Sequence, residues 1–299
     1  MNKVRKLFYS KKVAPYVFVC PFILSFMFFW IYPLISTGMM SFQDITPTGT
    51  DWIGFNNYKK LVKDTVFHTA ILNSFEYMAL TLVLLIPFPM LFAVLIDSRL
   101  VKAKGFWKAC LYVPALTSVV ISGTLFRLMF SEYPTGQMNM LTSALGLGTF
   151  KWLKMKATGL SALLIVCCWR WTGVNMLYFI SGLKAIDTSL YESADIDGAS
   201  AWQKFRYVTV PLLKPTIIYV ITISVYAGLS MFMESYMLWA GPDSPNNIGL
   251  TIVGYLYKRG ITKNQLGYGS AVGIVLLVIA LAINMVQLIM NGTFKKEED

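Results

Sequence analysis

Long apolar runs alternate with polar segments along the whole sequence. The runs fall at residues 14 to 40, 71 to 96, 106 to 130, 159 to 182, 216 to 240 and 267 to 290. A helix of about 20 apolar residues is long enough to cross the hydrocarbon core of a bilayer. The pattern therefore predicts an all-α membrane protein with six transmembrane helices, and the even number of crossings places both termini on one side.

The first two runs and the segment between them need separate interpretation. The first run follows a basic stretch, as in a signal peptide, but it is too long and too aromatic and has no small-residue cleavage site, so we predict an uncleaved transmembrane helix. The polar segment from 41 to 70 predicts an aqueous loop with a short helix near residues 58 to 62. Pro87 and Pro89 should kink the second run, which helices buried among neighbours in a membrane tolerate.

A polar, charged segment from 191 to 215 separates the fourth and fifth runs. Ser189 and Glu192 have the spacing of a capping box, in which two side chains satisfy each other's free backbone N–H groups at the start of a helix. Gly198 can take the left-handed conformation that ends such a helix. We therefore predict a short helix, a glycine bend and a second amphipathic helix, with Trp202, Phe205 and Val208 on one face and Pro211 and Pro215 at its end.

The composition also indicates a membrane protein. Of 299 residues, 56% are hydrophobic and only 14% are charged, whereas an average soluble domain carries about 25% charged residues. The net charge is +11, and the basic residues are scattered at the ends of the apolar runs. This distribution favours anionic lipid head groups over nucleic acid as the partner of the basic residues. Neither a disulfide framework nor a metal site is predicted, because the four cysteines lie inside apolar runs and His68 is the single histidine.

The distribution of lysine and arginine predicts the orientation, since cytoplasmic loops carry an excess of both. The side that holds both termini and the segment from 191 to 215 carries more of them. Its basic residues are Lys3, Arg5, Lys6, Lys11, Lys12, Arg99, Lys102, Lys104, Lys108, Lys184, Lys204, Arg206, Lys214, Lys295 and Lys296. We therefore place both termini and the segment from 191 to 215 in the cytoplasm, with the other loops outside.

The sequence offers little for enzyme chemistry. It contains no nucleotide-binding glycine loop, no nucleophile with a partner base and no cluster of metal ligands. Arg170, Glu76 and Glu234 are ionisable and lie within apolar runs. A charge there costs about 2.5–3.5 kcal/mol on insertion scales, so Arg170 should face protein or water. Glu234 is one possible partner for Arg170 and Glu76 is the other. Such a pair could fix helix packing or belong to a solute path.

Polar and small side chains form stripes at helical spacing on two runs. Trp171, Asn175 and Tyr178 share one face of the fourth run. The fifth run carries a similar stripe of Ser224, Gly228, Met231 and Ser235, with Phe232 adding an aromatic ring. Small and polar stripes are commonly helix contacts in membranes, although the same groups suit a neutral polyhydroxylated solute. Together with Arg170 and Glu234, these residues are candidates for a solute path.

The segment from 192 to 211 resembles a known motif. It reads E-S-A-x-x-D-G-A, followed by Phe205 and V-T-V-P, and is similar to the EAA loop in membrane subunits of ATP-binding-cassette (ABC) importers, specifically the MalF-type carbohydrate permeases. Similar stretches extend over nearly the whole chain. They are APYVFVCPFILSFMFFWIYPLI at 14 to 35, IGFNNYKKL at 53 to 61, LYVPAL at 111 to 116, AGP at 240 to 242 and GYGSAVGIVLL at 267 to 277. LFYSKK at 7 to 12, WRW at 169 to 171 and MFMESY at 231 to 236 resemble the arabino-oligosaccharide permease subgroup.

The resemblance implies a type I importer fold and a transport role without enzyme activity. The chain would be one permease subunit of a sugar importer in a bacterial inner membrane, with a cytoplasmic N-terminus (1 to 13), a first helix and outer loop (14 to 66), a permease core (67 to 291) that contains the EAA loop (188 to 215), and a cytoplasmic tail (292 to 299). Its implied partners are a second permease subunit, two cytoplasmic ATPase subunits that bind ATP and Mg²⁺, and an external solute-binding protein. This chain itself would bind no cofactor.

The family pattern also implies roles for individual residues. Glu192, Ala194, Asp197 and Gly198 match the pattern of the coupling helix that docks in a cleft of one ATPase subunit, while Ser193 replaces the usual alanine. The loops from 41 to 70, 131 to 157 and 241 to 266 would engage the solute-binding protein. Alternatives are an ABC permease for amino acids or polyamines, an ion-coupled secondary transporter, which would show inverted repeats, and a polytopic membrane enzyme, which would need a catalytic cluster.

Overall fold

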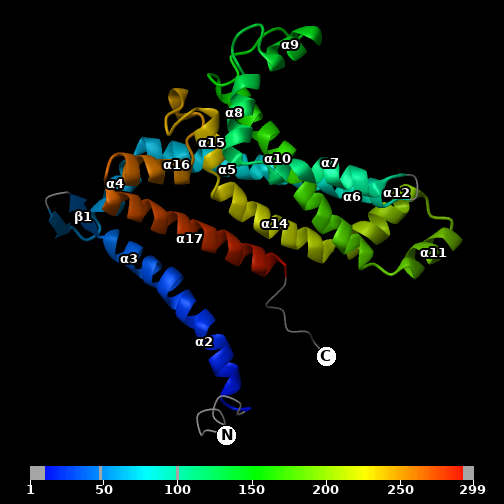
Figure 1. Ribbon diagram of the computed structural model, residues 1–299, viewed down its shortest axis with the longest axis horizontal. Coiled ribbons are helices and arrows are strands. Elements are labelled where there is room, and N and C mark those ends of the chain that lie inside the picture. Colours follow the sequence, from blue (N-terminus) through cyan, green and yellow to red (C-terminus); the bar gives the residue numbers. More distant parts are fainter. Residues whose placement is uncertain (1–10, 47–48, 99–100, 292–299) are drawn as a thin grey trace, which may run out of the picture. The chain divides into compact units, whose positions relative to one another are not determined.

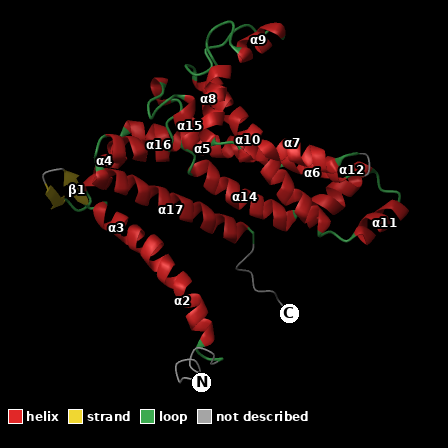
Figure 2. Ribbon diagram, in the orientation of Figure 1, coloured by secondary structure: helices red, strands yellow, loops and turns green. Residues whose placement is uncertain are grey.

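The computed structural model describes residues 11–46, 49–98 and 101–291. Helices form almost all of the regular structure in these ranges, and the exception is one two-stranded hairpin (Figures 1 and 2). The predicted cytoplasmic tail and the first ten residues of the predicted N-terminus lie outside the described residues. The chain divides into two compact units, one from 1–63 and 256–277 and the other from 64–255 and 278–299.

The first unit begins with one continuous apolar helix. It comprises α2 (Ala14–Phe26), a π-helical turn η1 (Met27–Ile31) and α3 (Tyr32–Met40), and its 27 residues are enough to cross a bilayer. A hairpin that the sequence did not predict follows, with β1 (Gln43–Thr46) antiparallel to β2 (Gly49–Trp52) and Gln43 opposite Trp52. The predicted short helix is α4 (Asn56–Lys63). Its buried Asn57 amide donates to the carbonyls of Ser41 (2.9 Å) and Gln43 (3.0 Å), which anchors the hairpin to α4.

The second unit contains most of the remaining helices. They are α5 (Thr65–Leu85), α6 (Pro87–Asp97), α7 (Lys104–Leu116), α8 (Val119–Met129), α9 (Gln137–Ala144), α10 (Lys156–Lys184), α11 (Thr188–Ile196), α12 (Ala201–Lys204), η2 (Phe205–Thr209), α13 (Val210–Leu212), α14 (Lys214–Leu229), α15 (Met233–Leu238) and η3 (Pro245–Asn247). After α16 (Ile252–Leu256) and η4 (Tyr257–Thr262), α17 (Leu266–Met290) completes the described chain. The predicted effect of the prolines is visible, because the helix is interrupted at Ile86, directly before Pro87.

The third apolar run is broken, which the sequence interpretation missed. α7 and α8 meet at an angle of 94°. Pro114 lies in the last turn of α7 and cannot donate a backbone hydrogen bond, and Thr117 then takes an extended conformation. Ser118 starts the new helix, because its hydroxyl accepts from the backbone N–H of Val120 at 3.3 Å.

The fifth run also differs from the single helix expected between 216 and 240. α14 ends at Leu229, and residues 230 to 232 separate it from α15. The hydroxyl of Thr251 donates to the carbonyl of Met231 at 2.7 Å, so a side chain far along the chain satisfies a backbone group at this break. At its other end, α14 meets the helical segment Ala201–Leu212 at 66°. Within the described ranges four helices are long and apolar enough to cross a membrane, or six if each bent pair is one span.

Packing of the second unit centres on α10. This helix lies against α5, α6, α7 and α14, while α14 also packs along α5 (Figure 1). One cluster of buried side chains includes Phe126, Phe130 and Leu163, and another includes Phe179 and Val220. The Gln287 amide of α17 donates to the Thr222 hydroxyl of α14 at 2.6 Å, and a polar pair of this kind helps to fix two helices where no water competes.

A set of polar contacts fastens the segment from 247 to 252 to α5. The Asn73 amide donates to the carbonyls of Asn247 (2.8 Å), Ile248 (3.3 Å) and Leu250 (3.0 Å). The neighbouring Ser74 hydroxyl accepts from the backbone N–H of Ile252 at 3.0 Å. Both side chains are buried, so an irregular stretch of backbone finds its hydrogen bonds inside the protein.

Candidate functional site

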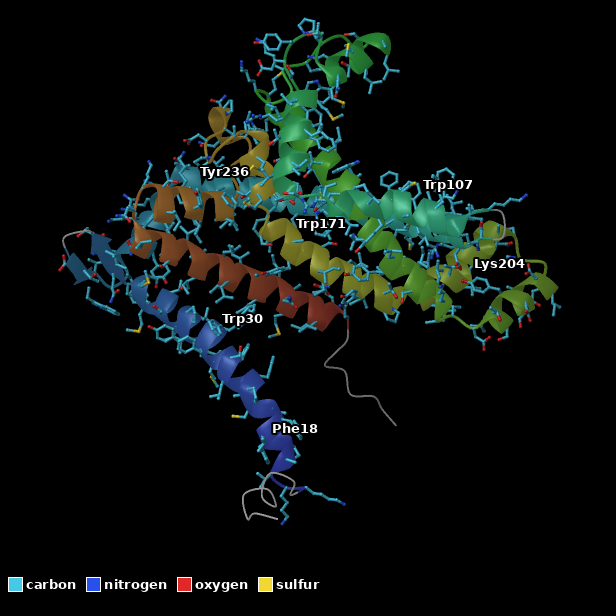
Figure 3. All side chains as sticks on the ribbon, viewed as in Figure 1. Phe18, Trp30, Trp107, Trp171, Lys204 and Tyr236 are labelled. Atoms are coloured by element: carbon cyan, nitrogen blue, oxygen red, sulfur yellow. The ribbon has the colours of Figure 1, made fainter. Side chains whose placement is uncertain are left out.

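A cavity of about 310 Å³ lies among α5, α10 and α14 in the second unit. Seven of the ten predicted solute-path residues line it, namely Trp171, Asn175, Tyr178, Ser224, Gly228, Met231 and Glu234. The lining also includes Tyr77, Thr81, Leu85, Cys167, Val174, Ile223, Ala227 and Ser230. The two predicted stripes therefore face a common space. Figure 3 places Trp171 among the side chains where these helices cross.

The other three predicted residues, Arg170, Phe232 and Ser235, are not among the lining side chains. Ser235 leaves the expected stripe because the helix breaks after Leu229, and its hydroxyl donates to the carbonyl of Gly249 at 2.5 Å. The ring of Phe232 packs against that of Tyr236, with 5.3 Å between centroids. The stripe on the fifth run thus contributes to the cavity only as far as Met231, and Glu234 comes from the separate helix α15.

Neither predicted ion pair of Arg170 occurs among the residues that the structure describes. Glu76 instead pairs with Lys156, with Nζ and Oε2 2.8 Å apart. The Arg170 guanidinium carbon lies 5.6 Å from the ring centroid of Trp171, a cation–π arrangement. Its Nε and Nη1 atoms are buried without a hydrogen-bond partner in the described part of the chain. Arg170 therefore contacts a wall residue of the cavity but does not line the cavity itself.

Asn175 has a structural task in addition to its place at the cavity. Its amide donates to the carbonyl of Leu85 at 3.0 Å. In an unbroken helix that carbonyl would accept from the residue four positions on, which is Pro89, and proline has no N–H to give. The buried Asn175 side chain supplies the missing donor. Pro89 indicates from the sequence alone that the Leu85 carbonyl lacks its helical donor. Asn175 could be identified as the replacement donor only from the position of α10 beside α5 and α6.

Two further features of the wall come from α5. Tyr77 and Thr81 are one helical turn apart and line the cavity, yet the sequence interpretation did not include them, although their spacing is a polar stripe like the other two. A Cβ atom at Gly228 would lie only 3.0 Å from the Cα and Cβ atoms of Met78. Gly228 thus permits close approach of α14 to α5, as small residues do in membrane helix pairs, and also borders the cavity.

The wall chemistry favours a particular kind of occupant. Hydroxyl groups come from Tyr77, Thr81, Tyr178, Ser224 and Ser230, and the rings of Trp171 and the two tyrosines offer flat apolar faces. An amide and one carboxylate complete the polar groups, at Asn175 and Glu234. Such a mixture can hydrogen-bond and stack a polyhydroxylated molecule without requiring it to carry a charge.

The second candidate site is the segment between α10 and α14. α11 begins at Thr188, and its N-cap is Asp187, whose carboxylate accepts from the backbone N–H of Ser189 at 2.9 Å. The capping box predicted at Ser189 and Glu192 was therefore wrong, because Asp187 already occupies the capping position. Hydrogen bonds from the backbone and side chain of Ser189 hold the pKa of the Asp187 carboxyl below its ordinary value.

A true capping box begins the next helix. The Ser200 hydroxyl accepts from the backbone N–H of Gln203 at 3.3 Å, and the Gln203 side chain accepts from the Ser200 N–H at 2.7 Å. The glycine bend between the two helices is as predicted. Gly198 has a φ of +72°, and the N–H groups of Gly198 and Ala199 return to the carbonyls of Asp195 and Ala194, which is the Schellman pattern.

Two side-chain contacts brace α11 against the following helical segment. Lys204, marked in Figure 3, forms an ion pair with Asp195 across the bend, with Nζ and Oδ1 2.5 Å apart. The Tyr191 and Thr209 hydroxyls lie 3.0 Å apart in hydrogen-bond contact. The angle between α11 and α12 is therefore fixed by the left-handed Gly198, by the capping box of α12 and by these two side-chain contacts.

The braced segment exposes both its predicted coupling residues and several large apolar side chains. Glu192, Ser193, Asp197 and Gly198 are exposed, and Ala194 is half-buried. Ile196, Trp202 and Tyr207 are 87%, 68% and 73% exposed. Large apolar side chains exposed on a charged segment such as this one are typical of a protein-binding surface.

Residues 70–296 match the family described as "Binding-protein-dependent transport system inner membrane component". The chain belongs to this family. The matched region contains every cavity-lining residue and the whole braced segment. Members of this family are membrane components of transport systems that use a binding protein, so the cavity and the exposed segment belong to a transport protein.

Individual relatives extend over nearly the full length of the chain. Two proteins named arabinooligosaccharides transport system permease protein AraP, from Bacillus subtilis (strain 168) and Halalkalibacterium halodurans, are each 47% identical and cover 98% and 99% of this chain and 93% of their own length. A solved bacterial alginate ABC transporter, in complex with an alginate pentasaccharide-bound periplasmic protein, contains a chain that matches with a TM-score of 0.83 and 26% identity, over 95% of both chains. The family and the subgroup expected from the sequence are both confirmed.

Proposed function

We propose that this chain is a permease subunit of an ABC importer for a neutral sugar or oligosaccharide, of the arabino-oligosaccharide type. The observation that carries the proposal is the cavity of about 310 Å³, whose wall combines hydroxyl, amide and aromatic groups. The 47% identity to permeases named for arabinooligosaccharides supports the same cargo class. Relatives named for carbohydrate transport do not favour an amino acid or polyamine cargo, or an ion-coupled secondary transporter.

In the membrane the chain would have six spans, with each bent pair acting as one crossing. The composition of the pair α7 and α8, and of Ala201–Leu212 with α14, supports this count, because each pair is long and apolar enough only when taken together. In the second pair, α12 would lie at the cytoplasmic surface, where the chain enters the membrane. The excess of lysine and arginine on one side supports a cytoplasmic position for both termini and for the segment α11–α12, in a bacterial cell.

The braced segment α11–α12 would be the coupling element of a type I importer. The docking partner is one of two cytoplasmic ATPase subunits, which bind the ATP and Mg²⁺ that this chain does not hold. The exposed Glu192, Ser193 and Asp197 side chains and the apolar Ile196 would contact the ATPase cleft. Because the ion pair of Asp195 with Lys204 fixes the bend, α11 would move as a unit with α12 and so transmit movement to α14.

Transport would proceed by alternating access. ATP binding closes the ATPase dimer, the docked segment moves with its subunit, and the cavity turns from one side of the membrane to the other. A second, homologous permease subunit would complete the path. An external solute-binding protein would deliver the sugar to the loops from 41 to 70, 131 to 157 and 241 to 266, a role supported by the periplasmic protein bound in the alginate transporter.

Purification tests this assignment. The chain, expressed with the neighbouring transport genes of its host, should co-purify with a second permease and an ATPase. In proteoliposomes the complex should take up labelled arabinotriose, with ATP hydrolysis stimulated by the loaded binding protein. A purified chain that brings down no ATPase, or a complex whose hydrolysis ignores the binding protein and whose uptake of arabinotriose is absent, would contradict the proposal.

A further inference from the structure

The cavity wall carries an unbalanced charge. Among the lining residues that the structure describes, Glu234 is the carboxylate, and neither lysine nor arginine is present. Glu234 comes from α15, the short helix that follows the break after Leu229, and its side chain is half-buried. An aqueous cavity bordered by one uncompensated carboxylate presents a negative potential to whatever enters it.

Lys156 and Arg170, both on α10, could balance Glu234 by pairing with it, and neither does so in the described residues. Lys156 pairs with Glu76 at 2.8 Å, in a neighbouring part of the unit. The Arg170 guanidinium lies against the ring of Trp171, and Arg170 is not among the lining side chains. In the described ranges no ion pair joins Glu234 to a basic residue. Of Arg170 and Glu234, only Glu234 therefore borders the cavity.

We infer that Glu234 makes this cavity selective for uncharged sugars and excludes sugars that carry a carboxylate. This inference rests on the proposed role of the cavity as the solute path. The carboxylate can accept hydrogen bonds from two neighbouring hydroxyls of a neutral sugar, and charge-assisted bonds of this kind are about twice as strong as neutral ones. The same group repels a uronate.

The expected size of the discrimination follows from Coulomb's law. For two unit negative charges about 6 Å apart at an effective dielectric constant of about 20, repulsion weakens binding roughly a hundredfold. Water in the cavity raises the dielectric constant and reduces the effect, so roughly tenfold is the lower bound expected at a dielectric constant of about 40. The other polar wall groups, such as Ser224 and Asn175, are uncharged and would contribute no such term.

The test pairs a charge on the sugar with the charge on the protein. The purified, complete transporter is held by vanadate after ATP binding, the binding protein is washed away, and binding of two labelled probes is measured at neutral pH. One probe is a trisaccharide that ends in a glucuronate and the other is its methyl ester, which differs by the loss of the charge. Arabinotriose serves as the neutral reference, and Glu234→Gln is compared with the wild type and with Glu76→Gln.

In the wild type the ester should bind about 10- to 100-fold more tightly than the free acid, and Glu234→Gln should bring this ratio close to one by strengthening binding of the acid. Glu76→Gln, which removes a carboxylate that is paired and outside the cavity, should keep the wild-type ratio. A ratio near one in the wild type, or an unchanged ratio in Glu234→Gln, would overturn the inference. If Glu234→Gln does not assemble, Glu234→Ala provides the same comparison. If neither variant assembles, a ratio of ester to free-acid affinity near one in the wild type still contradicts the inference.

Failure of the proposed function has a different signature. In that case the wild-type transporter binds neither arabinotriose nor the ester. Binding of both neutral probes combined with a charge-independent ratio leaves the transport assignment intact and removes only the selective role of Glu234.

Discussion

Gly198 offers the sharpest test of the coupling segment, because its replacement perturbs only the backbone. It has a φ of +72°, and no heavy atom lies within 4 Å of a Cβ built at this position. A side chain at Gly198 therefore meets no steric obstacle within the chain, and the cost is the left-handed conformation alone, about 1–2 kcal/mol. That cost lowers the ratio of bent to unbent segment by roughly 5–30-fold. The change matters here because α11 has only nine residues and is largely exposed, and helices of this length are marginal without packing.

The chain supplies a matched control at Gly146. This glycine ends α9 by the same Schellman pattern, has a φ of +77° and also has open space around a Cβ. Gly198→Val should lower sugar uptake per ATP hydrolysed several-fold in proteoliposomes while assembly persists. Gly146 lies in a loop assigned to the solute-binding protein, so Gly146→Val should change uptake and stimulated hydrolysis together and leave their ratio close to wild type. Gly198→Asn should also remain close to wild type, because asparagine tolerates the left-handed region. Equal loss in both valine variants, or an asparagine variant as impaired as Gly198→Val, would refute the backbone argument.

Three further predictions concern stability. Asn175→Leu should lower the free energy of unfolding by about 1–3 kcal/mol, because the Leu85 carbonyl loses its donor, and an unchanged midpoint in thermal unfolding of the purified complex would contradict this. Asn73→Leu should free the segment from 247 to 252, so limited proteolysis should cut there faster than in the wild type; equal cleavage rates would argue against the anchoring role. Asp187 has a lowered pKa, so its stabilisation of α11 should be complete above the ordinary value of 3.8 and disappear as pH falls through the lower folded value. Hydrogen exchange at the Ser189 amide should report this loss below about pH 4, whereas Asp187→Asn should show no such acid transition in protection.

The apolar pattern was sufficient to predict most of the helical architecture, because long apolar runs have few alternatives in a membrane protein. It could not locate the breaks at Thr117 and Ser230. Each break depends on a local competitor for backbone hydrogen bonds, such as the Ser118 cap, or on a distant one, such as Thr251 bound to Met231. Hydrophobicity does not report such competition. The hairpin at 43 to 52 was missed because its short strands carry no strong alternation.

Helical spacing predicted much of the cavity wall, since a stripe such as Trp171, Asn175 and Tyr178 stays on one face while the helix is unbroken. The prediction failed for Ser235, where the break redirects the chain. The partners in the ion pairs could not be predicted from the sequence either. Arg170 and Glu234 are both ionisable and lie in neighbouring runs, but whether they pair depends on the direction of their side chains. Glu76 pairs instead with Lys156, a residue that sequence interpretation used only for the orientation of the chain in the membrane.

The position of Asn175 restricts how this transporter can acquire a new cargo during evolution. Its side-chain nitrogen compensates for a proline in a neighbouring helix, while the same side chain borders the cavity. A substitution there that improved the fit of another sugar would also leave the Leu85 carbonyl at the α5–α6 junction without its donor. Adaptation is therefore expected to proceed through wall positions without such a side-chain contact, such as Ala227 or Ile223, and to reach Asn175 only in lineages that have first lost the proline at position 89.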